Sequence, residues 1–302
     1  MQHFETRPLR LGLPLWGQAD WKGSLYPVDA APREYLTHYA RVMDAVEGNT
    51  TFYSVPPAAT VARWLEQTPE QFRFSFKFPR LVTHDRALRH VERETADFLG
   101  RLAPLGPRLG RFLLQFPRGF GPLELPELGR YLRRLPTDFR YAVEVRHPAF
   151  FGRAGREQLD AVLFAHGAER VVMDTRGMRA GDATHPDVAA AAHEKPDVPV
   201  AVRALTDEPI IRFVAHPRVS TNAPFMARWA EVLVDWILAG RRPTFFMHCP
   251  NNAHSPGLAL RLDRLVRARI DMPVLPLAAA ESVARTAARA AEQASGAQLS
   301  LL

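Results

Sequence analysis

Eight short apolar runs alternate along the chain with segments of helical character, and this alternation limits the fold more than any other feature. Strands separated by helices form parallel sheets, and eight such units are the number that closes a (β/α)8 TIM barrel. The predicted strands are residues 9–15, 42–47, 72–78, 111–116, 141–146, 170–174, 210–215 and 243–248. The predicted helices include residues 58–67, 88–103, 124–135, 155–166, 222–239 and 257–269. We therefore expect an α/β fold, a TIM barrel.

The 302-residue length suits one barrel, which typically needs about 250 residues, followed by a tail. We expect a single TIM-barrel domain over residues 1–272 and a flexible, alanine-rich C-terminal tail over residues 273–302. Residues 176–208 are too long for one short connection, and they form a predicted irregular insertion before the seventh strand. A short alanine-rich helix is expected within it, at residues 187–193.

Several classes of protein are disfavoured by what the sequence lacks. No apolar run approaches the roughly 20 residues that span a membrane, and the first residues lack the apolar stretch of a secretory signal. Cys249 is the only cysteine, so no disulfide forms within the chain. We expect a cytoplasmic protein that does not associate with a membrane.

The formal net charge of +7 is typical of a protein that binds anions or nucleic acid, but here it is weak support. Nearly all of the positive charge is arginine, and Lys22, Lys77 and Lys195 are the only lysines. A GC-rich genome produces the same bias without any functional cause. The basic residues are also dispersed rather than clustered.

Polar residues stand at the C-terminal ends of seven of the eight predicted strands, and the first strand ends near Trp16. Active sites of TIM barrels lie at these ends, and residues two apart on a strand share a face. The candidate catalytic residues are Glu47, Lys77, Glu144, Asp174 and His248, and the candidate substrate-binding residues are Trp16, Asn49, Tyr53, Gln115, Arg146, Arg212 and Asn252. The alternative is a set of paired charges that only support the barrel.

These residue types allow several chemistries. Lys77, Arg146 and Arg212 together would form an anion clamp for phosphate or carboxylate. A lysine among cations can have a lowered pKa and form an imine, although a counter-ion role is commoner. Glu47 and Glu144 on different strands are typical of glycoside hydrolases. The carboxylates and histidines would also bind a divalent metal, but no HxH, HExxH or CxxC spacing supports one, so the cofactor is left open.

Five stretches, "LGLPLWGQADWKGSLYP", "VEGNTTFYSVP", "FRFSFKFPRLVTH", "FLLQFP" and "YAVEVRHPAFF", resemble the YecE-like family (domain of unknown function 72). The resemblance covers roughly residues 9–272 and implies a TIM barrel in a bacterial cytoplasmic protein, with no established reaction. Two departures stand out. Arg212 is followed by Phe-Val-Ala where much of the family has Leu-His-Gly. The eighth strand of many relatives ends in an aromatic residue followed directly by Asn-Asn, whereas here His248, Cys249 and Pro250 come before Asn251 and Asn252, which puts the roles of these two asparagines in doubt.

The chain ends "QLSLL", which resembles the peptide by which many bacterial DNA polymerases and repair proteins bind the replication sliding clamp. Gln298, Leu299, Leu301 and Leu302 would be the binding residues, with leucine in place of the phenylalanine often found last. Such a short match also arises by chance. If the peptide is functional, the protein is associated with DNA.

Three functions remain open from the sequence. The first is a hydrolase or lyase for a small anionic, phosphate-bearing or phosphodiester substrate, associated with DNA through the C-terminal peptide. The second is an enzyme for a small sugar-like or carboxylate substrate, suggested by Glu47, Glu144, Trp16 and Tyr53. The third is a non-catalytic scaffold.

Overall fold

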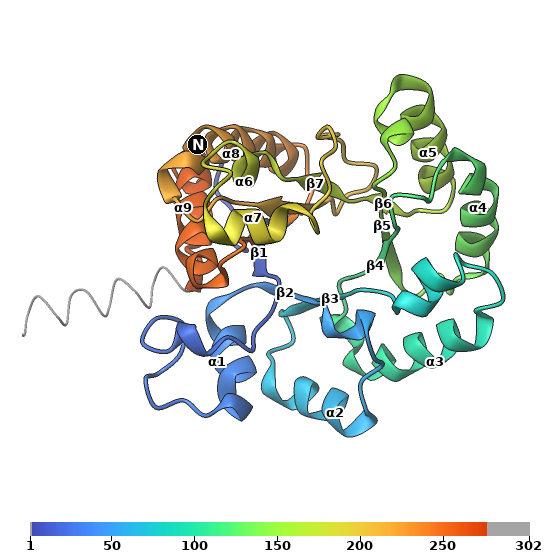
Figure 1. Ribbon diagram of the computed structural model, residues 1–302. Helices are drawn as coiled ribbons and strands as arrows, with labels where there is room; N and C mark the ends of the chain where they lie inside the picture. Colours follow the sequence, from blue (N-terminus) through green and yellow to red (C-terminus); the bar gives the residue numbers. More distant parts are fainter. Residues whose placement is uncertain (1, 277–302) are drawn as a thin grey trace, which may run out of the picture.

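The computed structural model describes residues 2–276 and shows an α/β fold in which helices lie around a set of parallel strands (Figure 1). The strands are β1 (Arg10–Leu13), β2 (Ala45–Gly48), β3 (Arg73–Phe76), β4 (Arg111–Gln115), β5 (Arg140–Glu144), β6 (Glu169–Arg170), β7 (Val172–Asp174), β8 (Ile210–Val214) and β9 (Thr244–His248). The α-helices are α1 (Tyr35–Val42), α2 (Ala58–Gln67), α3 (Glu92–Leu102), α4 (Leu125–Arg134), α5 (Arg153–Ala165), α6 (Arg176–Arg179), α7 (Pro186–Ala192), α8 (Ala223–Leu238) and α9 (Ser255–Arg267).

The strands form two parallel sheets rather than the single eight-stranded sheet that the sequence predicts. One sheet has six strands in the order β3-β2-β1-β9-β8-β7, and the other has three in the order β4-β5-β6. The predicted strand 170–174 is interrupted at Val171, and its two parts pair with different sheets. The α/β fold with parallel strands is confirmed, and the prediction of one uninterrupted sixth strand is wrong.

Backbone hydrogen bonds also connect the two sheets along their neighbouring edges, β3 and β4. The Gly110 amide donates to the Phe74 carbonyl at 2.7 Å, and the Phe78 amide donates to the Leu113 carbonyl at 3.0 Å. At the other junction, the Val171 amide donates to the Val143 carbonyl at 2.9 Å and continues the pairing of β5 with β6. Both edges of the three-stranded sheet therefore lie next to the six-stranded one.

A small buried cluster lies where strands of both sheets face a common interior. It consists of Ala45, Leu113, Ala142, Val171, Ile210 and Phe246. The strands approach one another so closely here that a Cβ added to Gly12 of β1 would lie 2.5 Å from the Ala45 carbonyl oxygen. The larger apolar core packs the outer faces of the strands against the helices, as where Trp64 of α2 stacks on Phe76 of β3.

One predicted strand differs from the structure at its start, and the predicted insertion agrees with it. The predicted strand 42–47 begins three residues too early, because Val42 ends α1 and β2 begins only at Ala45. Tyr35, Leu36, Tyr39 and Ala40 of α1 are buried at helical spacing. The insertion 176–208 contains α6 and α7 and is otherwise irregular, as predicted.

The chain remains packed on the core as far as Leu275, which is fully buried. Residues 277–302, with most of the predicted tail and the whole "QLSLL" peptide, lie outside the described residues. Within residues 2–276, no helix is both long and apolar enough to cross a membrane.

Candidate functional site

A cavity of about 820 Å³ lies at the C-terminal ends of the strands and gathers most of the predicted site residues. Its walls include Trp16, Glu47, Asn49, Tyr53, Lys77, Gln115, Arg146, Arg212, His248 and Asn252. Because the strands are parallel, their C-terminal residues meet at one end, as the sequence predicts. Glu144 and Asp174 are not among the residues that line it.

At the floor of the cavity, the guanidinium of Arg212 binds two glutamates. Its Nε and Nη2 donate to the two carboxylate oxygens of Glu47 at 2.7 and 2.8 Å, and its Nη1 donates to Glu144. Nη1 also donates to the Gln115 side-chain oxygen at 3.4 Å. Four of the five N–H groups of Arg212 are thus used within the protein, which leaves little of the anion clamp predicted for it.

The same ion pairs fix the ionisation of the two buried carboxylates. Burial raises the pKa of Glu144, but the positive charges of Arg212 and Arg146 outweigh it and bring this pKa to about 2. Burial likewise opposes ionisation of Glu47, yet Arg212 and His248 hold its pKa well below the usual range. Glu47 and Glu144 are therefore carboxylates at neutral pH, and neither is available as a general acid.

Lys77 is the residue directly after β3, and its amine forms only a long ion pair with the nearest carboxylate. Its Nζ lies 4.0 Å from the Glu47 carboxylate and 5.9 Å from the centre of the Phe52 ring, and 13% of its side chain is exposed. Burial and the positive charge of Arg212 lower the pKa of Lys77 to about 7, although Glu47 and Glu144 raise it. A large fraction of the amine is therefore unprotonated at neutral pH.

His248 is the last residue of β9 and stands beside Glu47, with 3.3 Å between Nε2 and a carboxylate oxygen. Since a carboxylate only accepts hydrogen bonds, Nε2 carries the proton and donates it. Burial lowers the pKa of His248 to about 4, despite the opposing charge of Glu47. Next to it, burial raises the pKa of the Cys249 thiol to about 12. Neither group changes its charge near pH 7.

Two asparagines at the rim have buried side-chain oxygens without a hydrogen-bond partner among the described residues. They are Oδ1 of Asn49 and Oδ1 of Asn252. Asn49 is fixed by its Nδ2, which donates to the Pro14 carbonyl at 2.8 Å, and the Asn252 carbonyl accepts a hydrogen bond from Trp21. Because unpaired buried acceptors are costly, both oxygens are suited to a substrate hydroxyl or amine.

Two aromatic side chains differ in how firmly the protein holds them. The Trp16 ring packs edge-on against Trp64 at 5.4 Å and Phe74 at 6.1 Å, so it is a fixed wall. Tyr53 is 82% exposed at the mouth, where its ring packs edge-on against Phe52 at 5.2 Å. An exposed ring at the entrance is free to cover a bound substrate.

Asp174 lies apart from this cavity, and its geometry gives no support to the predicted catalytic role. Its carboxylate accepts from the Arg176 guanidinium at 2.8 and 3.0 Å and from the Trp229 indole at 2.7 Å. It thereby attaches the end of β7 to α8. Glu144 does not line the cavity either, but it holds two arginines that do. Arg212 donates to its carboxylate, and so does Nε of Arg146, at 3.0 Å.

The pattern at the strand ends does not indicate Lys195, Arg80 or Phe52, which also line the cavity; His84, which lines it too, is one of the histidines considered from the sequence for a metal alone. Lys195 follows α7 in the irregular insertion, where no strand-end rule applies. Burial and the positive charge of Arg212 lower the pKa of Lys195 as well, although Glu47 and Glu144 raise it. The scarcity of lysine is the signal that the sequence offers for Lys195. The arginine-rich chain has only three lysines, and two of them, Lys77 and Lys195, line this cavity.

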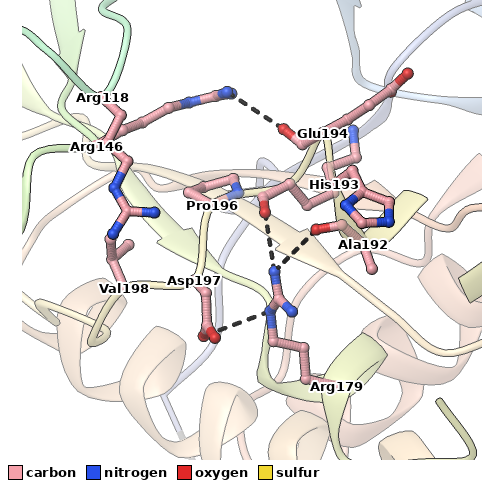
Figure 2. A pocket seen from close by; sticks show the side chains of 10 residues that line it. Arg118, Arg146, Arg179, Ala192, His193, Glu194, Pro196, Asp197 and Val198 are labelled. Atoms are coloured by element: carbon pink, nitrogen blue, oxygen red, sulfur yellow. Dashed lines mark hydrogen bonds and ion pairs between the residues drawn. The ribbon is translucent and has the colours of Figure 1, made fainter. Parts of the chain in front are cut away.

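A second, smaller cavity of about 360 Å³ adjoins the first and shares Arg146, Glu194 and Lys195 with it (Figure 2). Arg179 fixes this region, since its Nη2 donates to the carbonyl of Lys195 at 2.9 Å and its Nε pairs with Asp197 at 3.5 Å. Arg146 reaches the Glu194 carbonyl at 3.4 Å. These contacts hold the insertion against the cavity and so position Lys195.

The histidines and carboxylates are not arranged as a metal site. Over residues 2–276, no three His, Cys, Asp or Glu side chains form a group that would hold a metal ion. The Glu47 and Glu144 carboxylates are bound to Arg212, which competes with a cation for the same oxygens.

Comparison with known proteins gives a consistent result. The family model described as "Protein of unknown function DUF72" matches residues 10–282. The chain is 39% identical over 249 residues to the UPF0759 protein YecE of Escherichia coli (strain K12), covering 82% of this chain and 89% of that one. It is 28% identical over 191 residues to the UPF0759 protein YunF of Bacillus subtilis (strain 168), covering 61% of this chain and 66% of that one.

Two crystal structures of DUF72 family proteins share the fold. The one from Enterococcus faecalis V583 matches with a TM-score of 0.67 at 20% identity, over 86% of this chain and 95% of that one. The one from Thermotoga maritima MSB8 matches with a TM-score of 0.66 at 22% identity, over 86% of this chain and 99% of that one. At these identities the likeness concerns the fold alone.

Proposed function

The chain belongs to the DUF72 family, whose function is unknown, and from its own residues we propose that it is a lyase for a phosphate-bearing carbonyl substrate, with Lys77 as the reactive group. The observation that carries this proposal is the Lys77 amine, which lies in the cavity at 4.0 Å from Glu47 and has a pKa near 7. His248 and Cys249 keep one charge state at this pH, so Lys77 is the group suited to act.

An unprotonated lysine is a nucleophile for carbonyl carbon. In the proposed first step, the Lys77 nitrogen forms a bond to the carbonyl carbon of the substrate. The carbonyl oxygen then leaves as water with the two amine hydrogens, and an imine remains. In the protonated imine, the Glu47 carboxylate, 4.0 Å from Nζ, would accept a proton from the carbon beside the imine carbon, and the electrons of that C–H bond would form an enamine. The leaving group on the carbon attached to the new double bond then departs with its bonding electrons. Water hydrolyses the remaining imine, which releases the carbonyl product and frees the Lys77 amine.

The charge of the cavity favours an anionic substrate. Arg212 is already neutralised by two glutamates. Arg80 and Arg146, which line the same walls, each pair through Nε with one carboxylate, that of Asp85 and that of Glu144, and keep further N–H groups on the guanidinium; Lys195 lines the walls too. A phosphate bound by these cations would place an attached sugar carbon near Lys77, and the unpaired oxygens of Asn49 and Asn252 would accept its hydroxyls.

The alternative of a glycoside hydrolase is less well supported. Such an enzyme needs one of its two carboxyl groups protonated at the working pH. Arg212 holds the pKa of Glu47 well below its usual range, and the pKa of Glu144 is about 2. Both would be unable to protonate a leaving group.

Reductive trapping tests the proposal directly. Borohydride added during incubation with ribose 5-phosphate, dihydroxyacetone phosphate or an abasic DNA oligonucleotide should fix one substrate on Lys77 by an amine linkage. Intact mass and peptide mapping would locate it. We expect the adduct to be lost in Lys77→Arg and kept in Lys22→Arg, a matched change at an exposed lysine. The absence of an adduct with every substrate, or an adduct of equal yield in Lys77→Arg, would contradict the proposal.

We also propose that the two sheets close into one (β/α)8 barrel, in which β6 and β7 act as a single sixth strand. The backbone hydrogen bonds between β3 and β4, and that of Val171 with Val143, support closure on both sides. The interior cluster, with members from both sheets, supports it further.

The association with DNA and a cytoplasmic location stay predictions. The association depends on residues 298–302, which the structure does not describe. Purified bacterial sliding clamp should bind the full chain and not a chain that ends at residue 297. Equal binding of both chains would remove the peptide from consideration.

A further inference from the structure

Four strands begin with an arginine, and these residues meet at the end of the sheets opposite the Lys77 cavity. They are Arg10 of β1, Arg73 of β3, Arg111 of β4 and Arg140 of β5. Parallel strands place their first residues at the same end. Arg242, two residues before β9, lies at this end too.

A cavity of about 430 Å³ opens there. Its charged residues are Arg10, Arg73, Arg140, Arg242, Asp138 and Glu208. Four guanidinium groups thus face two carboxylates, and none of these residues lines either cavity at the other end. This site is spatially separate from the proposed active site.

The ion pairs of this cavity leave part of its positive charge without a partner. Glu208 pairs with both Arg10, at 3.1 Å, and Arg140. Among the described residues, Arg73 donates to two backbone carbonyls, those of Glu70 at 2.7 Å and Phe72 at 3.0 Å, and to no carboxylate. Within residues 2–276, neither Arg73 nor Arg242 forms an ion pair.

The arginines also repel one another. Burial and then the positive charges of Arg242 and Arg140 lower the pKa of Arg10, although Glu208 raises it. Burial and then the charges of Arg10 and Arg242 lower the pKa of Arg73. The fold therefore holds like charges together in a partly enclosed space, where a bound anion would relieve the repulsion.

The wall behind these arginines is firmly built. Arg111 donates through Nε to the Glu208 carbonyl at 2.9 Å, and through its other nitrogens to Tyr141 and Thr206. These bonds hold the segment before β8 in place, and with it the Glu208 side chain between Arg10 and Arg140. Binding of an anion then requires little reorganisation.

We propose that this cavity binds an anion of the phosphate class with two or more negative charges, a diphosphate group in particular, between Arg10, Arg73, Arg140 and Arg242. The fork geometry of guanidinium suits phosphate oxygens, and several arginines match several oxygens. The site does not depend on the lyase activity proposed above.

Pyrophosphate binding to the full chain, measured by calorimetry at constant ionic strength, tests this site. Arg73→Gln with Arg242→Gln should weaken binding about tenfold or more, since each lost charge-assisted hydrogen bond contributes. Arg41→Gln with Arg261→Gln removes the same charge from exposed positions of α1 and α9 and should bind as the wild type does. Arg80→Gln with Lys195→Gln removes two cations of the Lys77 cavity; it should abolish at most a second binding event there and leave binding between Arg10, Arg73, Arg140 and Arg242 unchanged, which separates this site from the proposed active site.

A second readout guards against a loss of fold. Without ligand, the Arg73→Gln, Arg242→Gln protein should melt at the same or a higher temperature than the wild type, because repulsion is relieved. Arg242→Gln alone serves if the double variant does not fold, and it should show a smaller loss of binding. Orthophosphate should bind more weakly than pyrophosphate, and ADP comparably to it if the natural ligand is a nucleotide.

Several results would overturn the proposal. They are wild-type affinity for pyrophosphate in the Arg73→Gln, Arg242→Gln variant, an equal loss in the Arg41→Gln, Arg261→Gln control, loss of all binding in the Arg80→Gln, Lys195→Gln variant, and no binding to the wild type at millimolar pyrophosphate. Equal competition by chloride at the same ionic strength would show charge screening alone, and would overturn it too.

Discussion

Replacement of Arg212 by methionine is expected to destabilise the protein by about 3–5 kcal/mol at pH 7.5, or to prevent folding. Arg212 is 3% exposed and forms ion pairs with two glutamates that are equally buried. Without it, Glu47 and Glu144 would be two neighbouring buried carboxylates with too little positive charge, and that state is costly.

The dependence of this loss on pH identifies its cause. In the wild type the pKa of Glu144 is lowered to about 2, so its stabilising contribution is present above the unfolded pKa and is lost only in strong acid. In Arg212→Met, burial would raise the pKa of Glu47 and Glu144 above the unfolded value. Their destabilisation would then grow as the pH rises, and it would be smaller at pH 5 than at pH 7.5.

Urea unfolding at both pH values measures the effect. Arg93→Met is a suitable control, because Arg93 is 90% exposed and pairs with Asp97 at 3.8 Å on the surface of α3. That variant should unfold almost as the wild type does. An equal loss for Arg212→Met at pH 5 and pH 7.5 would show that packing, and not charge, is the reason for any instability.

Replacement of Lys77 by methionine should have the opposite effect on stability, a gain on the order of 2–4 kcal/mol at pH 6. The pKa of Lys77 falls from 10.5 to about 7 on folding, mainly through burial. The protonated form of Lys77 therefore lowers the free energy of unfolding of the wild type. The cost is complete below pH 7, shrinks as the pH rises from 7 towards 10.5, and is absent above that range.

Unfolding of Lys77→Met and wild type at pH 6, 8 and 10 would follow this change. The difference should be greatest at pH 6, smaller at pH 8 and mostly gone at pH 10, just below the unfolded pKa of 10.5. Lys22→Met, at an exposed lysine, should show no such trend. A Lys77→Met protein less stable than the wild type at pH 6 would mean that Lys77 serves mainly as a counter-ion to Glu47. A variant that is more stable yet unable to form the adduct is what a reactive lysine predicts.

The sequence predicts the fold and the main cavity well where strands are regular. Glu47, Lys77, Gln115 and Arg212 each stand within two residues of the end of an uninterrupted strand, and parallel pairing brings them together. Asp174 does not line the cavity, although it ends a strand, because it lies on the other face. Val171 belongs to the interior cluster and Val172 to the outer core, so Asp174, two residues after Val172, faces α8, where Trp229 donates to it.

Lys195 could not have been placed from its neighbours in the sequence. It lies in an irregular stretch without hydrophobic periodicity, and only the contacts of Arg179 and Arg146 fix that stretch on the cavity. The arginines at the opposite end of the strands could have been predicted from the sequence. They are the first residues of their strands, and parallel pairing brings first residues together just as it brings together the last ones.

The scarcity of lysine gives this protein an unusual chemical simplicity. Apart from Lys22, every lysine side chain of the sequence lies in the main cavity, and the remaining positive charge is arginine, which acylating reagents do not attack at neutral pH. A reagent that selects unprotonated amines would thus modify the cavity before the surface. Occupancy of the cavity can then be measured on the purified protein as protection of Lys77 and Lys195, without knowledge of the substrate.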